Sequence, residues 1–404
     1  MEFRTIREDE FDAFGLALSN AFGEVEAAED DVANGRLSIE FDRTFAAFDE
    51  GQIVGCAAVY TFSSVTPGGG TVGTAGITWV GVLPTHRRRG VLTELMRHML
   101  DQAAERGEPI ATLLASEGQI YGKFGFGLAV PGQSFDVALD RVRWAPGTRS
   151  EGRTRLMTHE EARPHLQAVY ERFASSRPGA VLLTDRQYSW NFSGITKPDE
   201  KELVAVHEDE HGVPDAYALY RIKHRWPRGL PSNTLTVHQL IACTPEASAS
   251  IWRFLFDIDL VSRVKTWDLA IDDPLTWQMA EPRALRANVE DILYVRPIDV
   301  AAALSARGYL EDGRLVIDVR DEFRPENTGT YELLVEGGKG SCVRSVAEPE
   351  IACTVHVVGG TYFGGVSWGT LARAGRLEER VKGAIARADA MFRTSVAPWP
   401  IIHF

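Results

Sequence analysis

Hydrophobic and polar positions in the first 140 residues switch between the period of a strand and the period of a helix. The predicted elements are a helix over residues 6–22, two strands between residues 43 and 60, a buried strand over residues 74–83, a helix from Gly90, and short strands over residues 109–115 and around residues 135–137. The helix that follows Gly90 has one apolar face, formed by Leu92, Leu95, Met96, Met99 and Leu100. Helices and strands alternating in this way indicate an α/β fold.

A fainter copy of the pattern follows between about residues 153 and 280. Its predicted elements are strands over residues 203–206, 217–222, 234–243 and 264–271 and a helix over residues 247–260. The corner at residues 242–247 lacks the basic cluster and the glycine that the first copy carries before its helix. A repeat that kept its fold and lost one site would explain this difference, and the sequence leaves open whether the repeat is real.

The chain changes character near residue 289, where a small α+β segment is predicted. It contains strands over residues 314–319, 329–335 and 351–358 and helices over residues 297–304 and 377–390. A chain of 404 residues is also too long for one ordinary core. We therefore expect three domains, over residues 1–150, 151–286 and 287–404.

Composition narrows the choice of partners. Hydrophobic residues make up 44% and charged residues 25%, as in soluble globular proteins. The net charge of −13 argues against nucleic acid and anionic membranes as partners and suits a cationic one, although such a charge is commonplace among soluble enzymes. Four scattered cysteines without a CxxC pair, a charged start and the lack of a long apolar run predict a cytoplasmic protein without metal or membrane span.

Two motifs are less informative than they look. Residues 207–211, His-Glu-Asp-Glu-His, match the HExxH pattern of zinc proteases. Zinc binding needs both histidines on one helical face, whereas this stretch follows a predicted strand and runs into a turn at residues 212–214. Gly122, Gly125 and Gly127 do not have dinucleotide-binding spacing. We expect them to let the backbone approach a ligand closely.

The strongest chemical signal lies where the buried strand meets the amphipathic helix. Residues 84–92 place Arg87, Arg88, Arg89 and Gly90 at a helix N-terminus. Free amides, the helix dipole and the arginines favour an anion there, and Thr93 adds a hydroxyl donor. The alternative is an ordinary basic corner between a strand and a helix.

These residues resemble the Gcn5-related N-acetyltransferase family. The family motif [Gln/Arg]-x-x-Gly-x-[Gly/Ala] is met by Arg87 and Gly90, and Leu92 departs from it at the last position. Residues 83–90 together with residues 115–127 are similar to the enhanced intracellular survival (Eis) acetyltransferases of mycobacteria and their actinobacterial relatives. That resemblance implies two tandem acetyltransferase-like domains with mixed sheets, a C-terminal sterol-carrier-like α+β domain, and a hexamer.

The resemblance also implies roles for individual residues. Acetyl-CoA would be bound by Val80, Gly81, Val82, Arg87, Arg88, Arg89, Gly90, Val91, Leu92, Thr93, Ser116 and Glu117. Tyr121 would be the general acid, and the terminal carboxylate of Phe404 would be the base. Without the resemblance, Tyr121 is better explained as a packing aromatic and the apolar ending at residues 399–404 as a seal on a domain surface.

The predicted function is therefore transfer of an acetyl group from acetyl-CoA to primary amines of a polycationic small molecule, such as an aminoglycoside, by direct attack on the thioester. An acidic run would recognise the cation, or is only a solvated face: Glu24, Glu26, Glu29, Asp30 and Asp31. Protein lysine acetylation is one alternative. A noncatalytic lipid-binding protein that uses the C-terminal domain is another, and the intact arginine-rich loop argues against it.

Overall fold

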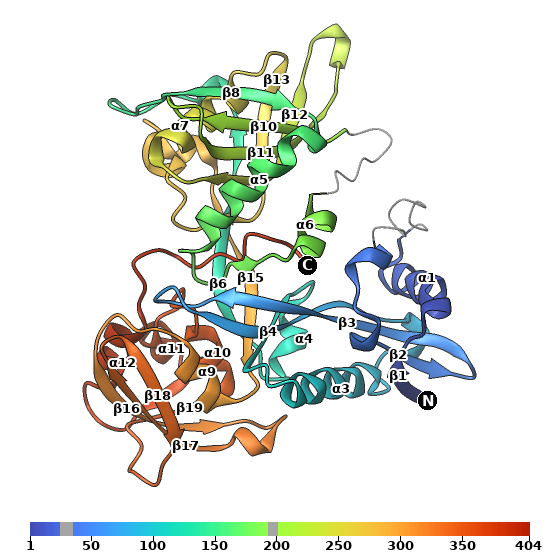
Figure 1. The fold of residues 1–404 in the computed structure, drawn as a ribbon, viewed down its shortest axis with the longest axis vertical. Coiled ribbons are helices and arrows are strands. Elements are labelled where there is room, and N and C mark those ends of the chain that lie inside the picture. Colours follow the sequence, from blue (N-terminus) through green and yellow to red (C-terminus); the bar gives the residue numbers. More distant parts are fainter. Residues whose placement is uncertain (25–34, 193–200) are drawn as a thin grey trace.

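The computed structural model describes residues 1–24, 35–192 and 201–404, and these residues form three β-sheets. Figure 1 shows the sheets as three bodies, with the first sheet lying between the other two. The bodies follow the chain in order, although individual strands cross between them. The predicted fold class of mixed sheets with helices is confirmed.

The first sheet carries the arginine-rich corner. Its strand order is β1-β2-β3-β4-β5-β15-β6-β14, and β9 pairs with β3. The strands are β1 (Glu2–Thr5), β2 (Thr44–Asp49), β3 (Gln52–Val65), β4 (Thr71–Val82), β5 (Ile110–Leu114), β15 (Asn288–Pro297), β6 (Gly127–Ser134), β14 (Leu269–Ala270) and β9 (Val181–Leu182). The helices of this part are α1 (Phe11–Phe22), α3 (Val91–Glu105) and α4 (Gly118–Gly122).

Helices cover both faces of the first sheet, and the alternation of side chains along β3 shows why. Ala57 and Val59 are buried in a cluster with the apolar face of α3. Cys56 and Tyr60 point the other way, into a cluster with the apolar residues of α1. Both faces of the strand are therefore apolar, as expected of a strand covered by helices on both sides.

The second sheet repeats this topology. Its order is β7-β13-β12-β11-β10-β8. The strands are β7 (Asp136–Ala138), β13 (Val261–Thr266), β12 (Asn233–Ala242), β11 (Pro214–Lys223), β10 (Leu203–Glu208) and β8 (Arg153–Met157), and the helices are α5 (His159–Ala174), α6 (Asp185–Asn191), α7 (Pro245–Phe256) and α8 (Leu275–Gln278). Helix α7 joins the parallel strands β12 and β13, as α3 joins the parallel strands β4 and β5.

The two sheets exchange strands. After β6 in the first sheet the chain enters the second sheet as β7, which pairs with β13. Later β15 returns to the first sheet and lies between β5 and β6. Hydrogen bonding therefore crosses both expected boundaries, at residues 150 and 286, and the three residue ranges stay a prediction.

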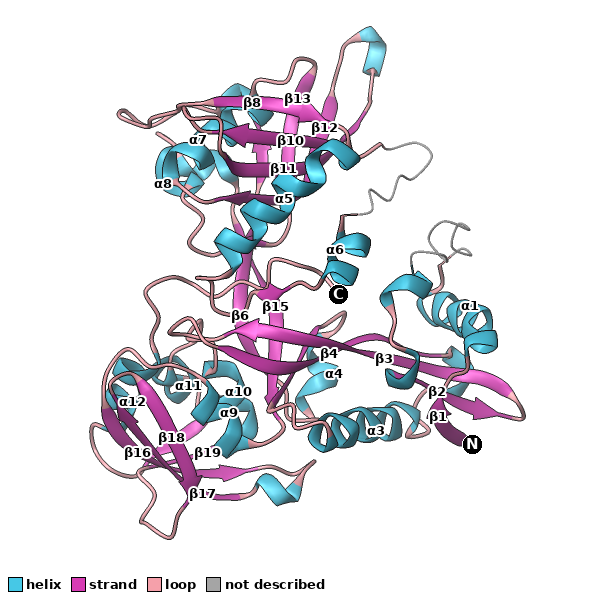
Figure 2. Ribbon diagram, in the orientation of Figure 1, coloured by secondary structure: helices cyan, strands magenta, loops and turns pink. Residues whose placement is uncertain are grey.

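The third sheet has the order β18-β17-β16-β19-β20. Its strands are β16 (Gly313–Arg320), β17 (Gly329–Glu336), β18 (Lys339–Arg344), β19 (Ile351–Thr354) and β20 (Leu377–Glu379), and its helices are α9 (Val300–Ala306), α10 (Val355–Thr361), α11 (Trp368–Arg373) and α12 (Ala384–Phe392). Figure 2 shows the helices gathered beside the sheet, and α10 contacts both β6 and β15 of the first sheet.

Several sequence predictions are wrong in this region and at the N-terminus. Residues 355–358 were predicted as strand and form the start of α10, whereas residues 377–379 were predicted as helix and form β20. The β-branched residues favour a strand locally, but α10 packs so closely on the first sheet that a Cβ on Gly359 would lie 2.2 Å from the carbonyl oxygen of Val295. Strands β1, β6, β8, β9, β15 and β18 were not predicted, and the first helix begins only at Phe11.

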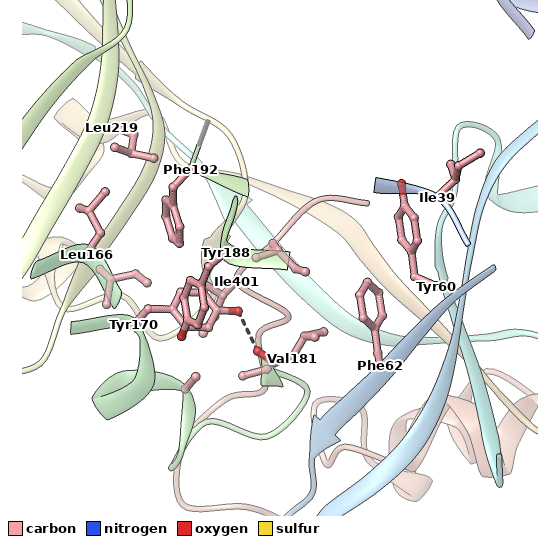
Figure 3. Close-up of a cluster of buried hydrophobic side chains, with 14 of the residues drawn as sticks. Ile39, Tyr60, Phe62, Leu166, Tyr170, Val181, Tyr188, Phe192, Leu219 and Ile401 are labelled. Atoms are coloured by element: carbon pink, nitrogen blue, oxygen red, sulfur yellow. Dashed lines mark hydrogen bonds between the residues drawn. The ribbon is translucent and has the colours of Figure 1, made fainter. Parts of the chain in front are cut away.

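The C-terminal tail runs back between the first and second bodies. Trp399, Ile401 and Ile402 are buried in one hydrophobic cluster with residues of both. Figure 3 shows Ile401 between Tyr170 of α5 on one side and Tyr60 and Phe62 of β3 on the other. The tail therefore helps to join two bodies, and it ends beside the first sheet.

Candidate active site

Strands β4 and β5 open into a V. They pair only at Thr74–Ile110, Ala75–Ala111 and Gly76–Thr112, although β4 continues to Val82 and β5 to Leu114. Beyond Gly76 the facing backbone groups of the two strands no longer bond each other. A cleft of about 840 Å³ lies there, between the end of β4, the start of α3 and helix α4. It is large enough for a nucleotide-sized ligand.

A β-bulge shapes the wall of this cleft. Thr78 pairs with Ala58 and Gly81 with Cys56, so two residues of β4, Trp79 and Val80, lie opposite one residue of β3. Trp79 has a φ of 53°, which is rare for an aromatic residue, and bulges of this kind redirect side chains next to functional sites. The bulge sends the Trp79 ring toward α1, while Val80, Gly81 and Val82 line the cleft. The bulge was not predicted, because a tryptophan in this conformation has no local signature in the sequence.

Gly81 is explained by the neighbouring helix. A Cβ there would lie 3.0 Å from the Cβ of Ala21 and 3.1 Å from Cδ1 of Leu18. The end of α1 therefore approaches β4 closely, and Ala21 and Phe22 become part of the cleft wall. Neither residue was predicted to line the site.

The turn before α3 presents backbone amides to the cleft. Arg88 and Gly90 have φ angles of 64° and 85°, and no described side chain caps α3 at Gly90. The first bond inside the helix runs from the Glu94 amide to the Gly90 carbonyl, at 3.1 Å. The preceding amides, from Val91 to Thr93, remain available to a ligand at the positive end of the helix dipole.

The arginines of the turn have different surroundings. Arg87 donates from Nε to the Val82 carbonyl (3.2 Å) and from a guanidinium nitrogen to the Ala21 carbonyl (2.8 Å). It braces the turn against β4 and α1. Arg88 also lines the cleft, together with Val91, Leu92 and Thr93, whereas Arg89 is outside the lining.

Tyr121 lies on α4 on the opposite wall, beside Ser116 and Glu117. Its side chain is 5% exposed, and its ring packs edge-on against Phe126 at 6.2 Å. Burial raises the pKa of Tyr121 to about 12, so the hydroxyl keeps its proton at neutral pH. The tyrosine is thus both a packing aromatic and a residue of the cleft.

Phe404 lies at the apex of the V. Its ring packs edge-on against Phe62 with centroids 4.9 Å apart, and a Cβ on Gly76 would lie 3.4 Å from it. Gly76 is the last residue of β4 that pairs with β5. The structure therefore brings the C-terminus to the point where the strands part, while Phe404 itself is not in the lining of the cleft that holds Tyr121.

Two of the glycines after Tyr121, Gly125 and Gly127, have a different role from the one expected, whereas a Cβ on Gly122 would have no described atom within 4 Å. A Cβ on Gly125 would lie 2.3 Å from the Arg296 guanidinium, and one on Gly127 would lie 2.0 Å from the His356 carbonyl oxygen. These glycines admit β15 and α10 and not a ligand. His356 also hydrogen-bonds the Gly122 carbonyl, so the third domain supports α4 from behind.

The two remaining sequence features are the acidic run and the HExxH match. In the acidic run, Glu24 is exposed at the end of α1, and Glu26, Glu29, Asp30 and Asp31 lie outside the described residues. His207 is on strand β10, where Nδ1 contacts Asp215 at 2.6 Å and Nε2 contacts the Glu151 carbonyl at 2.7 Å. His211 lies in the hairpin turn, so the two histidines do not share a helical face. No cluster of three or more possible metal ligands occurs in residues 1–24, 35–192 and 201–404.

Comparison with known proteins agrees with this geometry. Residues 2–129 and 182–297 each match a GNAT acetyltransferase domain family, and residues 300–400 match the sterol carrier protein domain family. An uncharacterized N-acetyltransferase of Streptomyces avermitilis is 36% identical over 98% of each chain. N-acetyltransferase Eis of Mycobacterium tuberculosis is 31% identical over 85% of this chain and 84% of its own.

The chain belongs to the Eis-like GNAT N-acetyltransferases. The crystal structure of Eis1 from Mycobacterium abscessus is also similar, with a TM-score of 0.85 and 31% identity over the whole of both chains. The predicted arrangement of two acetyltransferase domains and a sterol-carrier domain is thereby confirmed.

The second acetyltransferase domain of this Eis-like chain differs from the first at the start of the helix that follows the central strand. Thr244 caps α7, and its hydroxyl accepts the Ala247 amide at 3.1 Å. The equivalent helix start in the first domain, at Gly90, has no such cap among the described residues. One donor that an anion would need is therefore already bonded in the second domain. No described helix is long and apolar enough to cross a membrane.

Proposed function

We propose that this N-acetyltransferase moves an acetyl group from acetyl-CoA to primary amines of a polycationic small molecule, such as an aminoglycoside. The observation that carries the proposal is the V-shaped opening between β4 and β5, which ends at the uncapped start of α3. An extended pantetheine arm can hydrogen-bond the unpaired edge of β4 at Val80 and Val82. The pyrophosphate then meets the amides of Val91–Thr93 and the Arg88 side chain.

The chemistry is direct attack on the thioester. The nitrogen of the neutral amine bonds to the acetyl carbon, the carbon–sulfur bond breaks, and the coenzyme leaves as a thiolate. The nitrogen releases its extra proton to water as the amide forms. Backbone amides of the bulged part of β4 stabilise the developing oxyanion. Tyr121 faces the departing sulfur from α4.

The pKa of Tyr121 limits how it acts. A thiol has a reference pKa near ~8.5, and that of Tyr121 is about 12. Complete transfer of the tyrosine proton to the thiolate is thus uphill by roughly 5 kcal/mol. The hydroxyl serves first as a hydrogen-bond donor to sulfur, and solvent completes the protonation.

The amine arrives as an ammonium ion and must lose a proton before it attacks. We assign this step to the terminal carboxylate of Phe404, because the tail ends where β4 and β5 part. A free carboxylate is a weak base, so we place a water molecule between it and the amine. The net charge of −13 suits a polycationic substrate.

The lipid-binding alternative is less well supported. The interior of the third domain is filled by its own side chains, among them Trp368, Met391 and Phe392, each at most 2% exposed. Within the part of the chain that the structure describes, no feature favours protein lysine acetylation. The hexameric assembly and the cytoplasmic location stay predictions.

A thiol-release assay across amines tests the proposal. With acetyl-CoA present, aminoglycosides and linear polyamines should release coenzyme A faster than a lysine peptide of equal concentration. Faster turnover of the peptide would support the lysine alternative. Failure of every amine, with acetyl-CoA bound, would reject the proposed substrate class.

A further inference from the structure

The end of the chain is held by one carboxylate of the second domain. Asp268 lies in the turn between β13 and β14, and its side chain is 4% exposed. Oδ1 accepts a hydrogen bond from Nε1 of Trp399 at 2.9 Å. Oδ2 contacts Nε2 of His403, the residue before the terminus, at 2.5 Å. Asp268 therefore grips the tail on both sides of Ile401.

Backbone conformation indicates that holding the tail in this position strains the chain. Asp268 has a φ of 46° and Ile401 a φ of 71°. Left-handed backbone is especially unfavourable for a β-branched residue, and it persists only where the surroundings enforce it. The Ile401 carbonyl is also fixed, because it accepts a hydrogen bond from Nε2 of Gln239 at 3.1 Å. The last residues are therefore held in a single strained path.

The charges of this contact are matched. A buried carboxylate is costly unless it is paired and hydrogen-bonded. Burial lowers the pKa of His403, but the hydrogen bond and attraction to Asp268 outweigh it and leave that pKa raised. Protonated His403 balances the charge of the carboxylate, and Trp399 supplies a neutral donor.

We propose that Asp268 is a positioning residue that holds the terminal carboxylate of Phe404 at the apex of the β4–β5 opening. The inference rests on the proposed function, in which that carboxylate takes a proton from the amine. Proton transfer depends steeply on the placement of the base. The second domain, whose own helix start is capped by Thr244, would then contribute to catalysis by orienting a group at the site of the first.

The variant Asp268→Asn tests this directly, since it keeps the shape of the side chain and removes its charge. We expect kcat to fall by about 10-fold or more, with KM and Kd for acetyl-CoA unchanged. Asp215→Asn is a matched control: it removes another buried carboxylate–histidine pair of the second domain, with His207 at 2.6 Å. The control should retain its turnover at temperatures where both variants are folded.

Deleting Phe404 distinguishes the positioning role of Asp268 from the role of the terminal carboxylate as the base. If Asp268 acts through the terminal carboxylate, then Asp268→Asn lowers the residual rate of the shortened chain no further. The defect of each variant should also shrink as pH rises toward the pKa of the amine, because solution then supplies the neutral nucleophile. A simple structural defect would not follow the ionisation of the amine.

Each other outcome is decisive. A shortened chain with wild-type turnover rejects the terminal carboxylate as the base, and with it the positioning role of Asp268. If deleting Phe404 lowers kcat but Asp268→Asn keeps the wild-type kcat, only the positioning role of Asp268 is rejected. Additive defects also overturn it, because Asp268 would then act elsewhere. If Asp268→Asn does not fold, Trp399→Phe removes the indole donor while keeping the ring against Phe173, and the same outcomes apply.

Discussion

Replacing Tyr121 with phenylalanine removes a single hydroxyl from the cleft and leaves the ring against Phe126. A hydrogen bond to a charged group in a buried site is worth about 1.5–3 kcal/mol, which corresponds to a loss in kcat of roughly 10- to 150-fold. The interaction forms only as negative charge develops on sulfur, so acetyl-CoA affinity should barely change. Steady-state thiol release gives kcat, and isothermal titration gives the Kd of acetyl-CoA.

Tyr220 offers a matched control. It is 1% exposed in the core of the second domain, and burial raises its pKa to about 12, as for Tyr121. Tyr220→Phe should therefore carry a similar burial change without any loss of turnover. Wild-type kcat in Tyr121→Phe, or an equal loss in both variants, would refute the assignment of Tyr121 as the group that faces the sulfur.

Three further predictions concern the coenzyme, the base and pH. Gly90→Asp should abolish acetyl-CoA binding in titration, because no atom of the described residues lies within 4 Å of the new Cβ and the added charge opposes the pyrophosphate. Gly90→Asn carries the same strain of a left-handed backbone without the charge and should still bind, and equal affinity of the two variants would remove the anion site. Amidating the C-terminus at Phe404 by semisynthesis should lower turnover by about 10-fold or more while leaving acetyl-CoA bound, and unchanged turnover would mean that another group takes the proton. Since the pKa of Tyr121 is about 12, the pH–rate profile should rise with amine deprotonation and show no falling limb between pH 7 and about 10; a limb there in the folded enzyme would contradict a protonated Tyr121.

Local sequence was enough to locate the arginine-rich corner. A buried strand, a proline and an amphipathic helix are each encoded by neighbouring residues, and the uncapped helix start follows from their order. The β2–β3 hairpin and α3 were predicted nearly as they occur. The prediction that residues 207–211 run into a hairpin turn is confirmed, because strand periodicity on both sides is also a local signal.

Features that depend on distant partners were not predictable. A strand was predicted around residues 135–137, but its pairing in the second sheet as β7 was not, and β15 in the interior of the first sheet was not predicted at all. The residues with which β7 and β15 pair lie more than 100 positions away in the chain. The same reason explains why the start of α10 was mispredicted. Its β-branched residues favour a strand locally, and the close contact of Gly359 with β15 is made only in the folded protein. Gly125 and Gly127 were likewise misread, because the atoms that exclude their side chains come from the third domain.

The sequence by itself determined which residues belong to the acetyltransferase corner, because a helix start and its neighbouring strand are fixed by local periodicity and turn chemistry. Tertiary structure alone decided how the site is completed. The bulge at Trp79 arises only where β4 pairs with β3 and packs on α1. Phe404 reaches Gly76 only because Asp268 and the hydrophobic cluster between the first two domains hold a tail that is remote in sequence from both. Long-range burial and ion pairing, which leave no periodic trace in the chain, set the positions of those groups.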